Sequence, residues 1–432
     1  MAYLMKEYHH VCENEKVPFI PGVTRVPVSG KVFNYHERIA IVDAALEFWL
    51  TAGKYASEFE QEFSARLGAR HGSFVNSGSS ANLLAVTALT SSLIDKEYRL
   101  NPGDEVITVA ACFPTTVAPI VQVGAVPVFV DIDVDDGTYN ANVEQLRNAI
   151  TNKTKAVILA HTLGNPFDVE SVLSACESCK IWLIEDCCDA FCSIYHGEQV
   201  GNFGCMSTFS FYPAHHITTG EGGMVCTSDT RLNRIVKSFR DWGRDCHCHT
   251  GEDNACGHRF DRSFGTLPKG YDHKSVCQHL GYNLKATDMQ AAIGLAQLDK
   301  LDDFIEKRKS NWNYLSNGLS DLEDKIVLPK PTPKSDPSWF GFLITVREGI
   351  SRDSIVSYLE KHKIQTRPLF AGNITRHPCF TDGRYDYRIA SKLANTDRAM
   401  NDTFWVGVYP GLTKEMLDYT IEQIHNAVGE TQ

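Results

Sequence analysis

The chain has 432 residues, 43% of them hydrophobic, and a formal net charge of −11. This length predicts two or three domains, or one large α/β domain with an appendage, and the hydrophobic content is ordinary for a protein with a full core. The acidic balance and the absence of a dense run of Lys and Arg argue against nucleic acid as a partner.

The beginning of the chain does not resemble a signal peptide, because residues 1–16 contain Lys6, Glu7 and Glu13 and lack an apolar core. The most apolar segment, residues 117–130, is too short and too interrupted to span a bilayer. We therefore expect a cytoplasmic protein with no membrane partner. Most of its fourteen cysteines should then be reduced.

Short apolar segments rich in β-branched residues alternate with helical patterns through much of the chain. The expected strands are 73–75, 105–110, 126–131, 155–159, 180–184 and 206–211. The expected helices include one from about residue 36, then 58–67, 80 onward, 142–150 and 169–179. This alternation indicates a mostly parallel sheet with covering helices, and therefore an α/β fold.

A long loop-like stretch, residues 240–283, follows, and loops of this length are usually functional or disordered. Residues 288–308 then show the spacing of one long amphipathic helix leading to a smaller α+β domain. That domain should contain a strand at 340–346 and helices at 351–362 and 414–428. The predicted parts are an N-terminal arm with helices at 1–45, a large domain at 46–300 that includes the loop, and a small domain at 301–432.

Two short motifs lie where α/β proteins bind ligands. The Gly/Ser turn at 76–79 precedes a helix, whose first N–H groups can bind an anion, although an ordinary helix N-cap has the same pattern. Glu185 and Asp186 follow an expected strand, and ligands in open α/β sheets lie beyond the C-terminal strand ends. A carboxylate in this place could also be a helix N-cap.

The stretch at 208–223, T-F-S-F-Y-P-A-H-H-I-T-T-G-E-G-G, leads from a strand through a His pair into a Gly-rich turn. It resembles the cofactor-lysine segment of the DegT/DnrJ/EryC1 sugar aminotransferases, which use pyridoxal phosphate (PLP) in the aspartate aminotransferase fold, fold type I. Where those relatives carry the Lys that holds PLP as a Schiff base, this chain has His215. A His can transfer protons but cannot hold PLP in that way. Because the motif is short, His216 competes for the same assignment.

The resemblance also implies cofactor contacts. Gly78, Ser79 and Ser210 would hold the cofactor phosphate, and Phe113 would stack on the pyridine ring. Asp186, in the motif E-D-C-C-D-A, would face the pyridine nitrogen and keep it protonated, which makes the ring a better electron sink.

Two further positions follow from the same resemblance. Asp189 falls where relatives more often carry Gln or His, so the surroundings of the ring change together with the Lys. Asn283, in a G-Y-N segment, would reach the phosphate of the neighbouring subunit's cofactor. This role implies a homodimer with shared sites.

Cys246, Cys248 and Cys256 form a compact set of soft ligands in the long loop. The residues alone favour a metal site, with zinc as the first interpretation. The fourth ligand could be a local His or a distant Cys: His247, His249, His258 or Cys188.

With Cys188 included, the spacing reads C-x57-C-x-C-x7-C. Together with His215, this spacing resembles the CDP-4-keto-6-deoxy-D-glucose 3-dehydrase family, whose members carry pyridoxamine phosphate (PMP) and one [2Fe–2S] cluster. Four thiolates suit such a cluster. The resemblance covers nearly the whole chain.

This resemblance implies the reaction. The substrate would be CDP-4-keto-6-deoxy-D-glucose, on the route to 3,6-dideoxyhexoses of surface polysaccharide. His215 would remove a proton from the C4′ methylene of PMP, and the C3 hydroxyl would leave. An NADH-dependent iron–sulfur flavin reductase would supply electrons to the cluster.

Two other functions remain open. A glutamate-driven enzyme of the same fold, either an aminotransferase or a cluster-free dehydratase, would need Lys at position 215 or another route to PMP. A non-catalytic zinc-binding scaffold would not need the retained candidates for ring and phosphate contacts. The remaining cysteines are interpreted as structural: Cys12, Cys112, Cys176, Cys179, Cys187, Cys192, Cys205, Cys226, Cys277 and Cys379.

Overall fold

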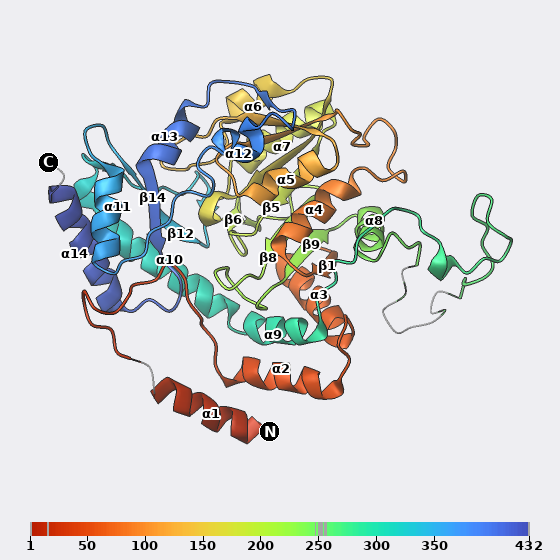
Figure 1. Cartoon of the computed structure of the whole chain (residues 1–432), viewed down its shortest axis with the longest axis horizontal. Helices are drawn as coiled ribbons and strands as arrows, with labels where there is room; N and C mark the ends of the chain where they lie inside the picture. The colour runs from red at the N-terminus through yellow and green to blue at the C-terminus, as the bar shows by residue number, and fades with distance from the viewer. Residues whose placement is uncertain (1, 15–16, 247, 249–253, 255–256, 431–432) are drawn as a thin grey trace.

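The computed structural model describes residues 2–14, 17–246, 248, 254 and 257–430. Figure 1 shows a central sheet flanked by helices, with a smaller group of strands and helices that contains the C-terminus beside it. Two N-terminal helices, α1 (Ala2–Asn14) and α2 (Tyr35–Glu47), run along one edge of the molecule. The arrangement agrees with the expected α/β architecture with a smaller C-terminal unit.

The central sheet has eight strands in the order β1-β9-β8-β5-β4-β2-β3-β13. The pairs from β8 to β13 are parallel, whereas β9 is antiparallel to both β8 and β1. The strands are β1 (His71–Val75), β2 (Glu105–Val109), β3 (Val126–Val130), β4 (Thr154–Ala160), β5 (Trp182–Asp186), β8 (Met206–Ser210), β9 (Gly223–Thr227) and β13 (Arg388–Ile389). The sheet is therefore mostly parallel, as the sequence predicts.

Side chains alternate between the two faces of this sheet because successive residues of a strand point in opposite directions. In β4, Val157 and Leu159 join the core on one face, and Ala156 and Ile158 join the core on the other. Both faces are covered by helices, which explains the continuous apolar runs of these strands. The covering helices are α3 (Lys54–Leu67), α4 (Gly78–Ala88), α5 (Pro114–Gln122), α6 (Val143–Ala149), α7 (Val169–Cys179) and α8 (Thr230–Arg240).

The C-terminal part has its own three-stranded antiparallel sheet, in the order β10-β12-β14. Helices pack on it around a separate core that includes Phe342, Leu359 and Ile424. Its elements are α10 (Leu301–Gly318), β10 (Ile326–Val327), β12 (Gly341–Val346), α11 (Arg352–Lys361), α13 (Ala394–Asp402), β14 (Thr403–Gly407) and α14 (Lys414–Glu430). The smaller elements are β6 (Ile194–Tyr195), β7 (Glu198–Gln199), β11 (Ser335–Asp336) and α12 (Pro378–Thr381).

The single helix expected at 288–308 is wrong: α9 (Asp288–Leu298) ends before α10 begins at Leu301. The two helices pack against different partners, α9 on α2 and α3 and α10 on α14 and β12. Asp302 and Asp303 lie in the first turn of α10, where negative charge favours a helix N-terminus. The apolar spacing continues through the break, so periodicity alone does not reveal it.

Two element boundaries also differ from expectation, the first for a long-range reason and the second for a local one. Helix α3 begins at Lys54 rather than 58, because the carboxylate of Asp288 accepts hydrogen bonds from the N–H groups of Gly53 (2.6 Å) and Ala56 (3.0 Å). Strand β5 begins at Trp182 rather than 180, because Lys180 ends α7 in the left-handed conformation with φ of 56°.

The stretch 240–283 contains little regular structure in its described part and projects beyond α8, away from the body of the molecule (Figure 1). Its two ends are tied together, since Asp241 pairs with Asn283 and Arg244 with Cys277. Among the helices of the described residues, none combines the length and the apolar character needed to cross a membrane.

Candidate active site

A cavity of about 630 Å³ lies at the carboxyl ends of the central strands. The first turn of α4, the end of β5 and the segment after β8 form its polar side, and residues of the C-terminal part, including Phe340 and Trp405, complete it. This is the edge at which open α/β sheets bind ligands. Seven of the eight predicted cofactor and catalytic residues line this cavity: Gly78, Ser79, Phe113, Asp186, Asp189, Ser210 and His215.

The N-terminus of α4 forms one wall of the cavity. Ser77 is the N-cap, and its side chain accepts a hydrogen bond from the N–H of Ser80 at 3.1 Å. Gly78 approaches Ser210 so closely that a Cβ at position 78 would lie 2.5 Å from the Cβ of Ser210. The turn and Ser210 are therefore adjacent, and the first N–H groups of an eleven-residue helix lie beside a hydroxyl group.

Asp186 is the last residue of β5 and is 5% exposed. Its Oδ2 accepts hydrogen bonds from Asn82 Nδ2 (2.9 Å) and Thr116 Oγ1 (2.8 Å), and its Oδ1 accepts one from the N–H of Cys188 (3.2 Å). Thr208 Oγ1 donates to Asn82 Oδ1 at 2.6 Å and so fixes the orientation of the amide. These donors hold the carboxylate in one position at the cavity wall.

Asn82 and Thr116 were not among the residues singled out from the sequence. They lie 104 and 70 positions from Asp186 along the chain. The available signal was a buried polar side chain, Asn82, inside the apolar run of α4. No helix begins directly after β5, so Asp186 is not a helix N-cap.

His215 and Asp189 form a pair beside Asp186. The Nδ1 of His215 lies 3.2 Å from Asp189 Oδ1, and the two side chains are only 15% and 10% exposed. The two atoms lie within ion-pair distance, but they do not form an aligned hydrogen bond. The His215 ring also lies 5.2 Å from the Phe340 ring, centroid to centroid. The sequence pointed to both polar residues separately, but not to their contact.

His216 points elsewhere. Its Nε2 lies 3.0 Å from the carbonyl oxygen and 2.9 Å from the hydroxyl oxygen of Ser338, and the residue is 3% exposed. Burial, with a smaller contribution from Arg308, lowers the pKa of His216 well below its ordinary value. Of the two neighbouring histidines, His215 is the one that lines the large cavity.

Three other side chains define the mouth of the cavity. Phe113 is half exposed and lies edge-on to Phe370, with ring centroids 6.4 Å apart. Tyr212, which the sequence did not single out, also lines the cavity and is 53% exposed. Among the described residues that line it, Arg367 is the only Lys or Arg. The cavity thus offers aromatic surfaces for a ring and one cation near its entrance.

Asn283 does not line the cavity of its own chain. It lies at the base of the 240–283 stretch, where its Oδ1 accepts a hydrogen bond from Lys285 Nζ at 2.8 Å. Lys285 also pairs with Asp241 at 3.1 Å. The expected contact of Asn283 with the cofactor of a neighbouring subunit stays a prediction.

The predicted cluster ligands are not assembled among the described residues. Cys188 lines the cavity, where burial, followed by the nearby Asp186, raises the pKa of its thiol well above the ordinary value. Cys246 and Cys248 are half-buried in the projecting loop, whereas Cys256 lies outside the described residues, as do His247 and His249. A thiol of raised pKa must lose its proton when it binds a metal.

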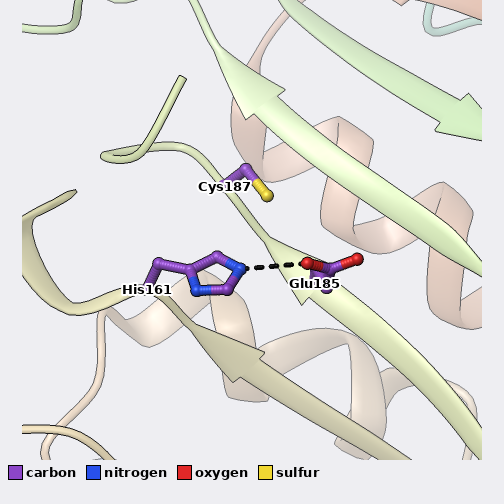
Figure 2. Close-up of side chains that lie close together, drawn as sticks. All are labelled: His161, Glu185 and Cys187. Carbon is purple, nitrogen blue, oxygen red and sulfur yellow. Dashed lines mark hydrogen bonds and ion pairs between the residues drawn. The ribbon is translucent and has the colours of Figure 1, made fainter. Parts of the chain in front are cut away.

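A different trio, His161, Glu185 and Cys187, is buried together (Figure 2). Within the described part of the chain, only this set offers three ligand atoms within 4.8 Å of one another. The carboxylate accepts His161 Nε2 at 3.2 Å and three N–H groups of 201–204 at 2.6 to 2.9 Å. His161 Nδ1 accepts the N–H of Phe167. A cation bound by Glu185 would lie against the N–H groups that already donate to this carboxylate. We therefore interpret the trio as structural: it ties His161 and the segment 201–204 to the end of β5.

Comparison with known proteins identifies the family. The model described as the DegT/DnrJ/EryC1/StrS aminotransferase family matches residues 34–425. The chain belongs to this family. Family members include proteins that resemble this chain along almost its whole length.

The lipopolysaccharide biosynthesis protein RfbH of Salmonella typhimurium is 51% identical over 99% of this chain and 97% of its own. The dTDP-4-dehydro-2,6-dideoxy-D-glucose 3-dehydratase of Saccharopolyspora spinosa is also 51% identical, over 99% of this chain and 91% of its own. A GDP-4-keto-6-deoxy-D-mannose 3-dehydratase of Escherichia coli is 31% identical over 92% and 98% of the two chains.

Solved structures of this family agree with the fold. A mutant of GDP-4-keto-6-deoxymannose-3-dehydratase (ColD) with bound GDP-perosamine superimposes with a TM-score of 0.83 at 28% identity, covering 92% of this chain and all of that one. The E. coli GDP-4-keto-6-deoxy-D-mannose-3-dehydratase with bound hydrated PLP gives a TM-score of 0.81 at 29% identity, covering 93% and 99%. The predicted fold type I of PLP-dependent enzymes is confirmed.

Proposed function

We propose that this chain removes the C3 hydroxyl group from a nucleotide-linked 4-keto-6-deoxy sugar, using PMP that it holds without a covalent bond. The observation that carries this proposal is the pair of His215 and Asp189 in the cavity, at the position where the aminotransferase pattern has a Lys. No Lys is among the described residues that line the cavity. Two of the relatives named above are sugar 3-dehydratases.

The residues present fit PMP. Gly78, Ser79 and Ser210 would hold its phosphate, Phe113 would cover its ring, and Asp186 would face its pyridine nitrogen. A phosphate suits the exposed N–H groups of α4, and the held carboxylate suits a protonated ring nitrogen. When bound, the cofactor would supply an amine for the 4-keto group and a ring that withdraws electrons.

His215 would act as the base that takes a proton from C4′ of the cofactor. An imidazole is suited to this step, because its ordinary pKa lies near neutrality. Asp189, at 3.2 Å from Nδ1, would orient the ring so that Nε2 is free to receive the proton, and would stabilise the imidazolium that results. The same imidazolium could then return a proton to the hydroxyl group that leaves C3.

The cavity also constrains the sugar nucleotide. Arg367 is the one cation among its described lining residues and would suit the substrate's diphosphate. We propose CDP-4-keto-6-deoxy-D-glucose as the substrate, on the basis of the cysteine spacing and His215. The dTDP-sugar enzyme of S. spinosa is as similar to this chain as RfbH is, so the nucleotide must be tested directly.

We further propose that Cys188, Cys246, Cys248 and Cys256 hold a [2Fe–2S] cluster, and that an NADH-dependent iron–sulfur flavin reductase supplies its electrons. The support is the C-x57-C-x-C-x7-C spacing, since four thiolates suit such a cluster. A homodimer is proposed because the resemblance assigns Asn283 to the phosphate of the neighbouring subunit's cofactor, and Asn283 does not line the cavity of its own chain. The projecting stretch 240–283 is seen in Figure 1.

The experiment is an anaerobic incubation of the purified protein with PMP and either the CDP- or the dTDP-linked 4-keto-6-deoxy sugar, with and without the reductase. Mass spectrometry should detect a product that has lost the C3 oxygen, formed faster from the preferred nucleotide. Formation of an amino sugar with glutamate as the donor, and no loss of the C3 oxygen, would instead identify an aminotransferase.

A further inference from the structure

Arg308, on α10, is a buried cation directly behind His215 and is 2% exposed. One of its terminal nitrogens donates to the carbonyl oxygens of Ala214 (3.3 Å) and His215 (3.2 Å). The other donates to the carbonyl oxygens of Trp339 (3.3 Å) and Phe340 (3.4 Å). The guanidinium group therefore joins the turn that carries His215 to the segment that enters β12.

The Arg308 side chain also lies close to Phe340, the aromatic ring beside the His215 imidazole. The guanidinium carbon of Arg308 is 5.8 Å from the centre of the Phe340 ring, and Phe340 lies against His215 and lines the cavity. Arg308 thus contacts both groups that set the position of the imidazole: the backbone of its turn and the ring on which it rests.

Burying this charge is costly unless the surroundings compensate for it. Burial lowers the pKa of Arg308 to about 10, and the negative charge of Asp189 opposes this effect. Asp189 is also the carboxylate that contacts His215. A neutral side chain would fill the same space without this cost, so an arginine at this position points to a use of its geometry or charge.

We propose that Arg308 is a positioning residue for His215, holding the His215 turn and Phe340 in the arrangement that the proton transfer needs. The planar fork of a guanidinium can bind carbonyl groups of two segments at once, whereas the ammonium of a Lys is a single point charge. This inference rests on the proposed role of His215 as the base.

The test compares Arg308→Lys and Arg308→Met with Lys309→Met as the matched control. Lys309 is the next residue of α10 and pairs with Asp336. In the Arg308 variants, kcat for tritium release from C4′-labelled PMP should fall by about 10- to 100-fold, because small misplacements of a catalytic group have effects of this size. The KM for the sugar and the affinity for PMP should stay within about twofold, as positioning affects the reacting groups rather than binding.

A second readout needs no cofactor. In the apo protein, the imidazole NMR signal of His215, assigned with His215→Asn, should move in Arg308→Met and stay in place in Lys309→Met. An unchanged kcat or an unmoved signal in Arg308→Lys and Arg308→Met would overturn the inference. A fall in kcat matched by equal losses of PMP affinity and thermal stability would also overturn it, since a purely structural role has that signature.

Failure of this inference can be separated from failure of the proposed function. If the unaltered protein and His215→Asn release tritium equally, the role of His215 itself is wrong. If release depends on His215 while the Arg308 variants behave like Lys309→Met, only the role of Arg308 is wrong. Should Arg308→Met not fold, Arg308→Lys, which keeps the charge, still decides the question.

Discussion

Replacing Asp189 with Asn tests whether the carboxylate beside His215 is used in proton transfer. The change keeps the size of the side chain but removes its charge, so the imidazolium formed when His215 takes the proton loses the carboxylate 3.2 Å from its Nδ1. We expect slower proton removal from C4′ of PMP with little change in PMP affinity, because the proposed phosphate and ring contacts come from other residues.

The size of the effect follows from the contact. Two unit charges 3.2 Å apart interact with about 5 kcal/mol at an effective dielectric constant of about 20, before any cost of desolvation. The net contribution of a contact with a charged group is smaller, about 1.5–3 kcal/mol. Since about 1.4 kcal/mol corresponds to a tenfold change in rate, Asp189→Asn should slow the step roughly 10- to 100-fold.

The assay is single-turnover tritium release from C4′-labelled PMP in the presence of the keto sugar. Asp336→Asn is the control, because it removes a carboxylate that pairs with Lys309 instead. Tritium release by Asp189→Asn at the unaltered rate would refute the reasoning. A loss of PMP affinity as large as the loss of rate would also refute it, since the carboxylate would then serve binding.

Three further results are expected. PMP should be lost on dialysis and borohydride should trap no cofactor on a lysine, whereas His215→Lys should bind PLP covalently through the introduced amine; absorbance after dialysis checks both. Replacing any of the four proposed cluster cysteines with Ser should abolish or severely weaken iron binding, whereas Cys176→Ser should not, as measured by iron and acid-labile sulfide. Full iron content in any one of the four variants would contradict the ligand set. Burial lowers the pKa of His216 in the folded protein. Below the ordinary pKa of about 6.5, the unfolded chain therefore binds a proton at this residue that the folded chain does not bind. As the pH is lowered below about 6.5, the free energy of unfolding should therefore fall by up to about 1.4 kcal/mol per pH unit more in the unaltered protein than in His216→Asn. Urea unfolding at several pH values measures this, and the same pH dependence in both proteins would contradict it.

The central strands β1 to β5 and β8 could be predicted because they are buried and leave apolar runs in the sequence. Two of the boundaries that failed depend on residues far away in sequence. Asp288 starts α3 from a distance of more than two hundred residues, and the break between α9 and α10 follows from their different packing partners. Local patterns carry no record of such contacts.

The candidate site shows the same division. Residue types at a strand end and at a helix N-terminus directed attention to Asp186 and the turn at 76–79, and the family resemblance added Ser210. Asp186, Ser210 and residues 77–79 line one cavity. The contacts that orient these groups could not be predicted, because Asn82 and Arg308 are brought in by tertiary packing. The choice between His215 and His216 likewise needed the direction of each side chain.

The central claim is that His215 takes the proton from C4′ of PMP, and one measurement tests it most directly. Tritium release from C4′-labelled PMP should be compared in His215→Asn and His216→Asn under single-turnover conditions, with PMP binding measured in parallel. Loss of a positioned base typically costs about 10²–10⁴ in rate, so His215→Asn should bind PMP and release almost no tritium, while His216→Asn releases it readily. Near-normal release in His215→Asn, with release lost in His216→Asn, would contradict the account.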